Sequence, residues 1–240
     1  MYAFFERVLD DRRHFPAFDA IENIRKLAMA SGGYAEVADH GTGRSGRTML
    51  RDLARRSACS SAQGRMLFRI ARWRQPATIL ELGTSIGIGT AYLASACPGS
   101  RVVSVEGAPE VADIARAHMK LLGLNHVDVQ TGRFEDVLPA LLPELRPIDL
   151  VYFDGNHRRQ ATLDYLEACL PWIHPDALLV FDDIHWSADM EDAWLAIRRH
   201  PKIRMTIDCF DFGVASCATQ FYEKQHFTAI PLRLKPWKIF

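Results

Sequence analysis

From Pro76 onward, the chain alternates short apolar runs with longer segments in which apolar residues recur at helical spacing. The apolar runs lie at 77–82, 101–106, 126–131, 148–154 and 177–183, and the helical segments after them at 89–96, 109–122, 135–145, 159–170 and 187–199. Nearly continuous apolar runs separated by helices predict parallel strands that are buried on both faces of a sheet. In such a sheet, ligands bind outside the carboxyl ends of the strands.

Two further β-like runs close this part of the chain, at 204–210 and 213–222. No helix separates them, so they are predicted to pair antiparallel. The expected fold of residues 76–240 is therefore an α/β, doubly wound, Rossmann-like sheet. It is mostly parallel and seven-stranded, with an antiparallel last strand.

Residues 1–75 have a different pattern and are expected to form an N-terminal helical extension or lid. Apolar residues at helical spacing predict helices at 17–30 and at 61–73, and Ser60 or Ser61 is suited to cap the second of these. The polar, glycine-rich stretch 31–47 between them indicates a loop.

The charge balance and the cysteines exclude several classes of protein. Lys and Arg number 29, as do Asp and Glu, so no net charge attracts nucleic acid. No apolar run approaches the ~20 residues of a membrane span. The five cysteines form no C-x-x-C pair, and the N-terminus turns charged too early for a signal peptide. We therefore expect a cytoplasmic protein with reduced thiols that binds neither nucleic acid nor membrane.

The first strand of the repeating pattern ends in a glycine-rich turn, Gly83 to Gly89, before a helix begins. Glycines let the chain bend tightly and let a ligand approach the backbone, and the helix start supplies unpaired N–H groups. The second strand ends at Glu106, where an acidic side chain accepts hydrogen bonds from ribose hydroxyls in such folds. These features predict an adenosine-type ligand.

The turn does not fit a dinucleotide. The fingerprint G-x-G-x-x-G starting at Gly83 would require glycine at Ser85 and Ile88, which disfavours a nicotinamide-dependent oxidoreductase. S-adenosylmethionine has no pyrophosphate, so it relaxes this demand. A literal G-x-G-x-x-G occurs at 41–46, but no strand precedes it and no acidic partner follows, so it is interpreted as a loop.

Three segments carry a resemblance to a known family: ILELGTSIGIGTAYLA (79–94), VVSVEG (102–107) and the stretch from Tyr152 to Trp186. Together they resemble class I S-adenosylmethionine-dependent methyltransferases over about residues 76–222. The pattern E-x-G-x-x-x-G is closest to the catechol- and caffeoyl-CoA-type O-methyltransferases. The resemblance implies an enzyme that methylates a hydroxyl of a small molecule.

The resemblance also implies a cofactor site. Gly83, Ser85 and Gly87 would line the methionine part, Glu106 would bind the ribose, and Arg133 with Phe134 would border the adenine. The predicted cofactor-binding residues are Glu81, Gly83, Thr84, Ser85, Gly87, Glu106, Gly107, Arg133, Phe134 and Asp154.

Acidic residues follow two strands that are expected to be neighbours, about 4.8 Å apart. Asp154 follows the fourth strand, while Asp182 and Asp183 end the fifth. Carboxylates gathered there repel one another unless a cation or protons intervene, and oxygen ligands favour Mg²⁺ or Ca²⁺. In the resembled family, these positions hold a divalent metal, although Asp183 replaces an Asn. The alternative is that Asp154 caps the helix beginning near Arg158.

A histidine stands where the resembled family has its catalytic lysine, three residues beyond the first metal-binding Asp. We expect this residue, His157, to be the general base, since its ordinary pKa of about 6.5 suits proton uptake at neutral pH. The alternative is a hydrogen bond to a loop carbonyl. His185 has three open roles: metal ligand, second base or structural residue.

The remaining expectations concern the ends of the chain and the function as a whole. Five arginines, Arg44, Arg47, Arg51, Arg55 and Arg56, form either a solvated face or a positively charged lid over an acidic acceptor. The apolar tail 227–240 would dock on its own domain or on a second subunit of a homodimer. The alternatives to metal-assisted O-methylation are a metal-independent methyltransferase acting on another nucleophile and a non-catalytic protein that binds an adenosine ligand.

Overall fold

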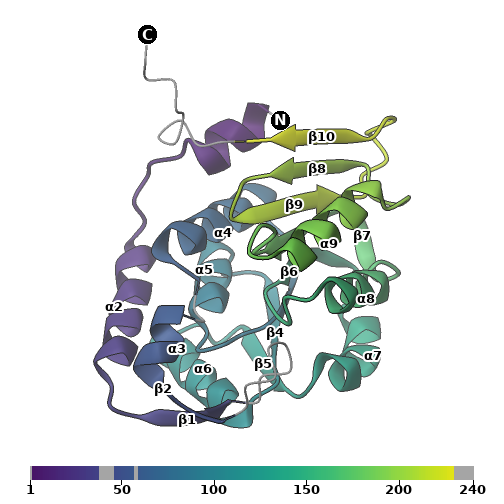
Figure 1. Cartoon of the computed structure of the whole chain (residues 1–240). Helices are drawn as coiled ribbons and strands as arrows, with labels where there is room; N and C mark the ends of the chain where they lie inside the picture. Colours follow the sequence, from purple (N-terminus) through teal and green to yellow (C-terminus); the bar gives the residue numbers. More distant parts are fainter. Residues whose placement is uncertain (1, 38–45, 57–58, 230–240) are drawn as a thin grey trace.

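The computed structural model describes residues 2–37, 46–56 and 59–229, and its centre is an eight-stranded sheet of order β10-β8-β9-β7-β6-β3-β4-β5 (Figure 1). The strands of this sheet are β3 (Thr78–Leu82), β4 (Arg101–Glu106), β5 (Val127–Thr131), β6 (Ile148–Phe153), β7 (Ile173–Asp182), β8 (Met205–Asp208), β9 (Phe212–Ser216) and β10 (Gln225–Thr228). Neighbouring strands pair parallel except at β9, which runs antiparallel to both β7 and β8. The predicted α/β sheet and its antiparallel pair are confirmed.

The sheet has one strand more than predicted. β10 pairs parallel with β8 at the edge, and Ala229 donates its backbone N–H to Asp208 just beyond it. The predicted strand 213–222 is also too long, since β9 ends at Ser216. Apolar and polar residues alternate only weakly in β10, and most of its residues are exposed. Its formation therefore depends on pairing with β8 at the edge of the sheet.

Helices cover both faces of the sheet. They are α4 (Ser61–Arg74), α5 (Ile88–Ala96), α6 (Pro109–Leu121), α7 (Phe134–Leu145), α8 (Arg159–Cys169) and α9 (Ala188–Arg199). The helical periodicity of the sequence predicted each of them within one or two residues of its observed ends. Each of the last five follows a strand of the sheet in the chain, as in crossover connections between parallel strands.

The sheet divides the core into two apolar layers. Along β3, Ile79 faces the first layer and Leu80 the second, and Val180 and Phe181 alternate in the same way along β7. The first layer is covered by α4, α5, α6 and the N-terminal helices, and the second by α7, α8 and α9 (Figure 1). This alternation is what a sheet buried on both faces requires, because successive side chains point to opposite faces.

The N-terminal extension packs on the first layer. It comprises α1 (Tyr2–Phe4), the π-helix η1 (Phe5–Leu9), α2 (Pro16–Ala30), β1 (Tyr34–Val37), β2 (Gly46–Met49), α3 (Leu50–Arg56) and α4. The prediction that residues 31–47 form a loop is wrong at both ends, because β1 and β2 pair antiparallel. Their pair docks on α6, where the Glu36 N–H donates to the Glu110 carboxylate at 2.8 Å. Residues 38–45, including most of the glycine motif at 41–46, lie outside the described residues.

Two observations concern the environment of the chain. Within the described ranges, none of the helices is both long enough and apolar enough to cross a membrane. All five cysteines are free thiols, and four of them are buried.

Candidate functional site

The glycine-rich turn after β3 lies at the carboxyl edge of the sheet, in a backbone conformation that needs glycine. Gly83 has φ +104°, and a Cβ added there would lie 2.1 Å from the carbonyl oxygen of Asp154. Gly87 caps α5 with φ +82°, and Ser85 between them has φ +48°. The turn therefore packs directly on the end of β6, so the predicted cofactor loop and the predicted acidic edge adjoin.

Glu106 lies at the end of β4, next to this turn. Its two carboxylate oxygens accept hydrogen bonds from backbone N–H groups, one from Ser85 at 2.8 Å and one from Ala108 at 3.0 Å. Gly107, which follows it, is half-buried. The carboxylate is thus fixed beside the turn, at the place where the sequence predicted a ribose-binding acid.

Glu81 lies beneath the turn and is fully buried. One of its carboxylate oxygens accepts hydrogen bonds from the hydroxyls of Thr90 and Ser104, and the Thr84 and Ser104 hydroxyl oxygens lie 2.5 Å apart. Burial raises the pKa of Glu81 to about 7. Glu81 and Thr84 therefore form one polar network under the predicted methionine site.

Arg133 and Phe134 lie where α7 begins, beyond β5. The Phe134 ring contacts Tyr165 edge-on at 5.1 Å between ring centroids. It also lies against Gly155, where an added Cβ would come within 2.7 Å of the ring. Arg133 extends toward Glu135 at 3.6 Å. Phe134 thus offers an aromatic edge close to the segment that follows Asp154.

The acidic edge forms where β6 and β7 end side by side. Their parallel pairing, with Phe153 opposite Phe181, confirms the predicted neighbourhood of Asp154 and Asp182. Asp182 is buried and accepts the Tyr152 hydroxyl at 2.9 Å and the Asp183 N–H at 3.0 Å. Burial, with the charge of Asp183, raises the pKa of Asp182 to about 7. Burial, with the charge of Asp182, holds the pKa of Asp154 well above its usual value.

His157 faces these carboxylates. Its Nε2 atom lies 3.7 Å from Oδ1 of Asp154 and 3.9 Å from Oδ2 of Asp183, and its ring lies 5.9 Å from that of Trp186. The side chain is half-buried. The structure therefore brings together the predicted base and the predicted metal-binding carboxylates.

Asp154 does not cap α8. The N-cap of α8 is Arg158, whose side chain makes no capping bond. The first helical N–H, that of Arg159, instead donates to the carboxylate of Asp189 at 2.5 Å. Asp154 is left facing Asp182 and His157.

A divalent cation fits this edge in donor chemistry. Across residues 2–37, 46–56 and 59–229, no three His, Cys, Asp or Glu side chains converge in a metal-binding arrangement. Asp154 and Asp182 nevertheless supply adjacent carboxylate oxygens, the donors that Mg²⁺ prefers. The charge of Asp182 raises the pKa of Asp154, and the charge of Asp183 raises the pKa of Asp182. A bound cation would relieve this repulsion.

His185 is engaged on both sides. Nε2 lies 2.9 Å from Asp208, at the end of β8, and Nδ1 lies 3.4 Å from Glu191, on α9. Among its three open roles, these contacts favour the structural one, since they tie the loop after β7 to a neighbouring strand and helix.

Two residues that sequence reasoning missed contact Asp182. Tyr152 on β6 donates its hydroxyl, and Gln63 in the first turn of α4 places its Nε2 atom 3.5 Å from Oδ1. Tyr152 lies in an apolar run of the sequence, which carries no signal for a polar contact to the site. The S-x-x-Q pattern at Ser60 gave a signal for helix capping but none for the site.

The predicted arginine cluster is only partly described. Arg47 stacks over the Tyr34 ring at 4.7 Å, while Arg51 and Arg55 line a pocket with Met29. Arg44 and the side chain of Arg56 lie outside the described residues. None of these contacts reaches the acidic edge.

Comparison with known proteins agrees with this fold. The sequence profile of a methyltransferase domain matches residues 80–184, from β3 to just beyond β7. A solved O-methyltransferase from Bacillus cereus, in complex with SAH, superposes with a TM-score of 0.62 at 21% identity, covering 89% of this chain and 97% of that one. The chain has the class I S-adenosylmethionine-dependent methyltransferase fold. The resemblance stated from its motifs is confirmed.

Curated relatives of this methyltransferase-fold chain are also O-methyltransferases by name. A catechol O-methyltransferase of Niastella koreensis is 32% identical over 128 residues, 52% of this chain and 57% of that protein. One of Mycobacterium tuberculosis is 33% identical over 131 residues, 54% and 58% respectively. The chain spans a little over half the length of these curated relatives.

Proposed function

We propose that the protein transfers the methyl group of S-adenosylmethionine to a hydroxyl of a small molecule. The observation that carries this proposal is the contact between Gly83 and the carbonyl of Asp154, because it joins a cofactor-type turn to an acidic edge in one site. The names of the curated relatives and the SAH complex of the Bacillus cereus protein support the same activity.

In this proposal, the cofactor occupies the turn between β3 and α5. Glu106 accepts hydrogen bonds from the ribose hydroxyls, and the backbone of Gly83, Ser85 and Gly87 borders the methionine part. Phe134 and Arg133 border the adenine. Glu81 lies buried beneath this turn, and the Asp154 carbonyl lies against Gly83.

We infer that Asp154, Asp182 and Asp183 hold a divalent cation, Mg²⁺ by the chemistry of their donors. When bound, such a cation orients the acceptor oxygen and lowers its pKa. The carboxylates of this chain supply its negative counter-charge, and the Tyr152 hydroxyl and Asp183 N–H fix the orientation of Asp182.

His157 is proposed as the base. The acceptor oxygen forms a bond to the methyl carbon while the carbon–sulfur bond breaks, and sulfur keeps the electron pair of that bond. The acceptor proton passes to Nε2 of His157, the atom that faces Asp154 and Asp183. The resulting imidazolium is stabilised by the two carboxylates. Most of the rate enhancement comes from holding the oxygen in line with the methyl group.

Calorimetric titration of the purified protein with S-adenosylmethionine tests the cofactor, with NAD⁺ as the control ligand. We expect stoichiometric binding of S-adenosylmethionine and no signal with NAD⁺. Binding of NAD⁺ alone would overturn the proposal. Binding of S-adenosylmethionine without turnover on any acceptor would favour the non-catalytic alternative.

Methylation of catechol, used as a probe acceptor, tests the base and the cation. We expect activity to be lost in EDTA and restored by Mg²⁺, and His157→Gln to reduce the rate by about 100-fold, as the loss of a general base does. Activity that is unaffected by EDTA would favour the second candidate, a metal-independent methyltransferase acting on another nucleophile.

We also propose a cytoplasmic location and a homodimeric state. Free thiols throughout the chain support a reducing compartment such as the cytoplasm. Light scattering after size-exclusion chromatography would test the proposed homodimer, since a monomeric mass would contradict it.

A further inference from the structure

The acidic edge receives a contact from a residue outside the sheet domain. Gln63, in the first turn of α4, belongs to the N-terminal extension. Its Oε1 atom accepts the Ser60 N–H at 2.8 Å, and its Nε2 atom lies 3.5 Å from Oδ1 of Asp182. Because the carbonyl end of the amide is occupied by Ser60, the NH₂ end is the one that faces the carboxylate.

The first turn of α4 is held in place by a capping box and by close packing against α5. Ser60 and Gln63 form a reciprocal capping box, in which the Ser60 hydroxyl accepts the Gln63 N–H at 3.2 Å. Gly64, the next residue, lies flat on the Tyr92 ring, and a Cβ there would come within 2.3 Å of ring carbons. Tyr92 is fully buried on α5, so the start of α4 is fixed relative to the helix that follows the cofactor turn.

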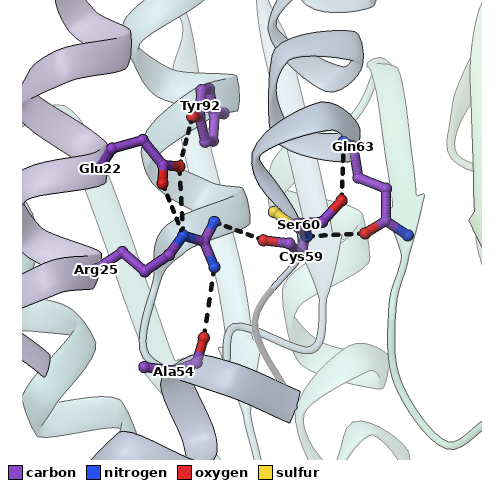
Figure 2. A network of polar contacts seen from close by, with 7 residues as sticks. All are labelled: Glu22, Arg25, Ala54, Cys59, Ser60, Gln63 and Tyr92. Carbon is purple, nitrogen blue, oxygen red and sulfur yellow. Dashed lines mark hydrogen bonds and ion pairs between the residues drawn. The ribbon is translucent and has the colours of Figure 1, made fainter. Parts of the chain in front are cut away.

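A buried ion pair anchors the chain that leads into this turn (Figure 2). Arg25 on α2 is 9% exposed and donates to the Cys59 carbonyl at 2.6 Å. It also pairs with Glu22 at 3.1 Å, and Glu22 accepts the Tyr92 hydroxyl at 2.8 Å. A buried guanidinium with three hydrogen-bond partners restricts their movement, because leaving its charge unpaired would be costly. Figure 2 shows that these groups converge from α2, α5 and the segment before α4.

The residue type at position 63 fits a role toward Asp182. A capping box accepts either Glu or Gln at this position. A carboxylate here would add another negative charge beside Asp182, whose neighbours Asp154 and Asp183 are already acidic. The amide keeps the cap and presents a hydrogen-bond donor instead of a charge.

We propose that Gln63 is a positioning residue for Asp182, supplied by the N-terminal extension to the site of methyl transfer. The inference rests on the proposed function. Gln63 donates to the Asp182 carboxylate together with the Tyr152 hydroxyl and the Asp183 N–H. Residues that hydrogen-bond to a functional carboxylate in this way fix its orientation.

Three variants separate positioning from helix capping. Gln63→Glu keeps the cap and replaces the donor by a charge, and Gln63→Leu removes both. Ser60→Ala is the matched control, because it removes the capping hydroxyl and keeps the backbone N–H that holds the Gln63 amide. We expect both Gln63 variants to lower kcat for catechol by about 10- to 100-fold with an unchanged KM for S-adenosylmethionine. Ser60→Ala should lower the melting temperature and leave kcat within about twofold of wild type.

A spectroscopic readout makes the test independent of turnover. With [4-¹³C]aspartate labelling at one fixed pH, the Asp182 carboxyl signal, assigned through Asp182→Asn, should move in both Gln63 variants and stay in place in Ser60→Ala. An unmoved signal, or a moved signal with unchanged kcat, overturns the proposal. If wild type does not methylate catechol while the signal moves as expected, Gln63 retains its positioning role and the proposed hydroxyl chemistry is what fails.

Discussion

The two halves of the site differ in how their acidic groups are compensated. On the side of β3 and β4, each oxygen of Glu106 accepts a hydrogen bond from a backbone N–H group. On the side of β6 and β7, Asp154 and Asp182 lie against each other with raised pKa values. Backbone donors compensate the first carboxylate, whereas carboxylates with excess negative charge require a proton or a cation.

Removing the negative charges of Asp154 and Asp182 should have the largest effect and would abolish the contrast between the two halves. The double variant Asp154→Asn, Asp182→Asn keeps the size of both side chains and removes both negative charges. We expect catechol methylation to fall by about 10³-fold, because cation stabilisation of the acceptor oxygen is worth several kcal/mol. Stimulation by Mg²⁺ should disappear. A double variant whose rate still rises with Mg²⁺ as in wild type would contradict the cation assignment.

Glu81, buried beneath the cofactor turn, should make the free energy of unfolding depend on pH. An unfolded chain loses this proton near pH 4.5, whereas the folded protein retains it up to a pKa of about 7. Between these values the folded state binds the extra proton, so the free energy of unfolding decreases as pH rises. The contribution is about 3 kcal/mol in total, fully present below pH 4.5 and lost above pH 7.

Urea unfolding at pH 5 to 8, without ligands, measures this effect. Glu81→Gln should show a shallower decrease than wild type and should gain stability relative to it as pH rises. The control is Glu144→Gln, an exposed position on α7, which should follow the wild-type curve. Parallel curves for wild type and Glu81→Gln would show that Glu81 does not carry the proton.

The smallest of the three effects is expected at Glu106. Glu106→Ala should raise the Kd for S-adenosylmethionine by about 10- to 100-fold, since hydrogen bonds to a charged group contribute about 1.5–3 kcal/mol. Calorimetry should detect no comparable change in Asp176→Ala, an exposed acidic residue on β7. Unchanged affinity in Glu106→Ala would remove Glu106 from the cofactor site.

The sequence predicted those parts of the site that depend on local pattern and strand order. The apolar runs gave β6 and β7 as neighbours, and Asp154 and Asp182 meet because both residues end parallel strands. His157 followed from its distance of three residues from Asp154, and its Nε2 atom indeed faces that carboxylate. These predictions succeed because side-chain position at the end of a strand is set by the strand itself.

The rest depends on contacts between segments distant in the chain. β1 forms in a polar stretch because Ala35 becomes buried and the Glu36 N–H reaches Glu110 on α6. Gln63 reaches Asp182 across 119 residues, through the way α4 packs on Tyr92. The spacing of apolar residues in the sequence does not predict such contacts, because tertiary packing overrides local preference.

The first apolar layer has a consequence for anyone who shortens this chain. It contains Phe18 and Ile21 of α2 and Leu67 of α4 together with Tyr92 and Ile79 of the sheet domain. The segment matched by the methyltransferase profile, 80–184, is therefore a unit of sequence comparison and not a unit that can be expressed alone. A truncated protein beginning at residue 76 would expose the face that these side chains now cover, and its insolubility would report on packing and reveal nothing about catalysis.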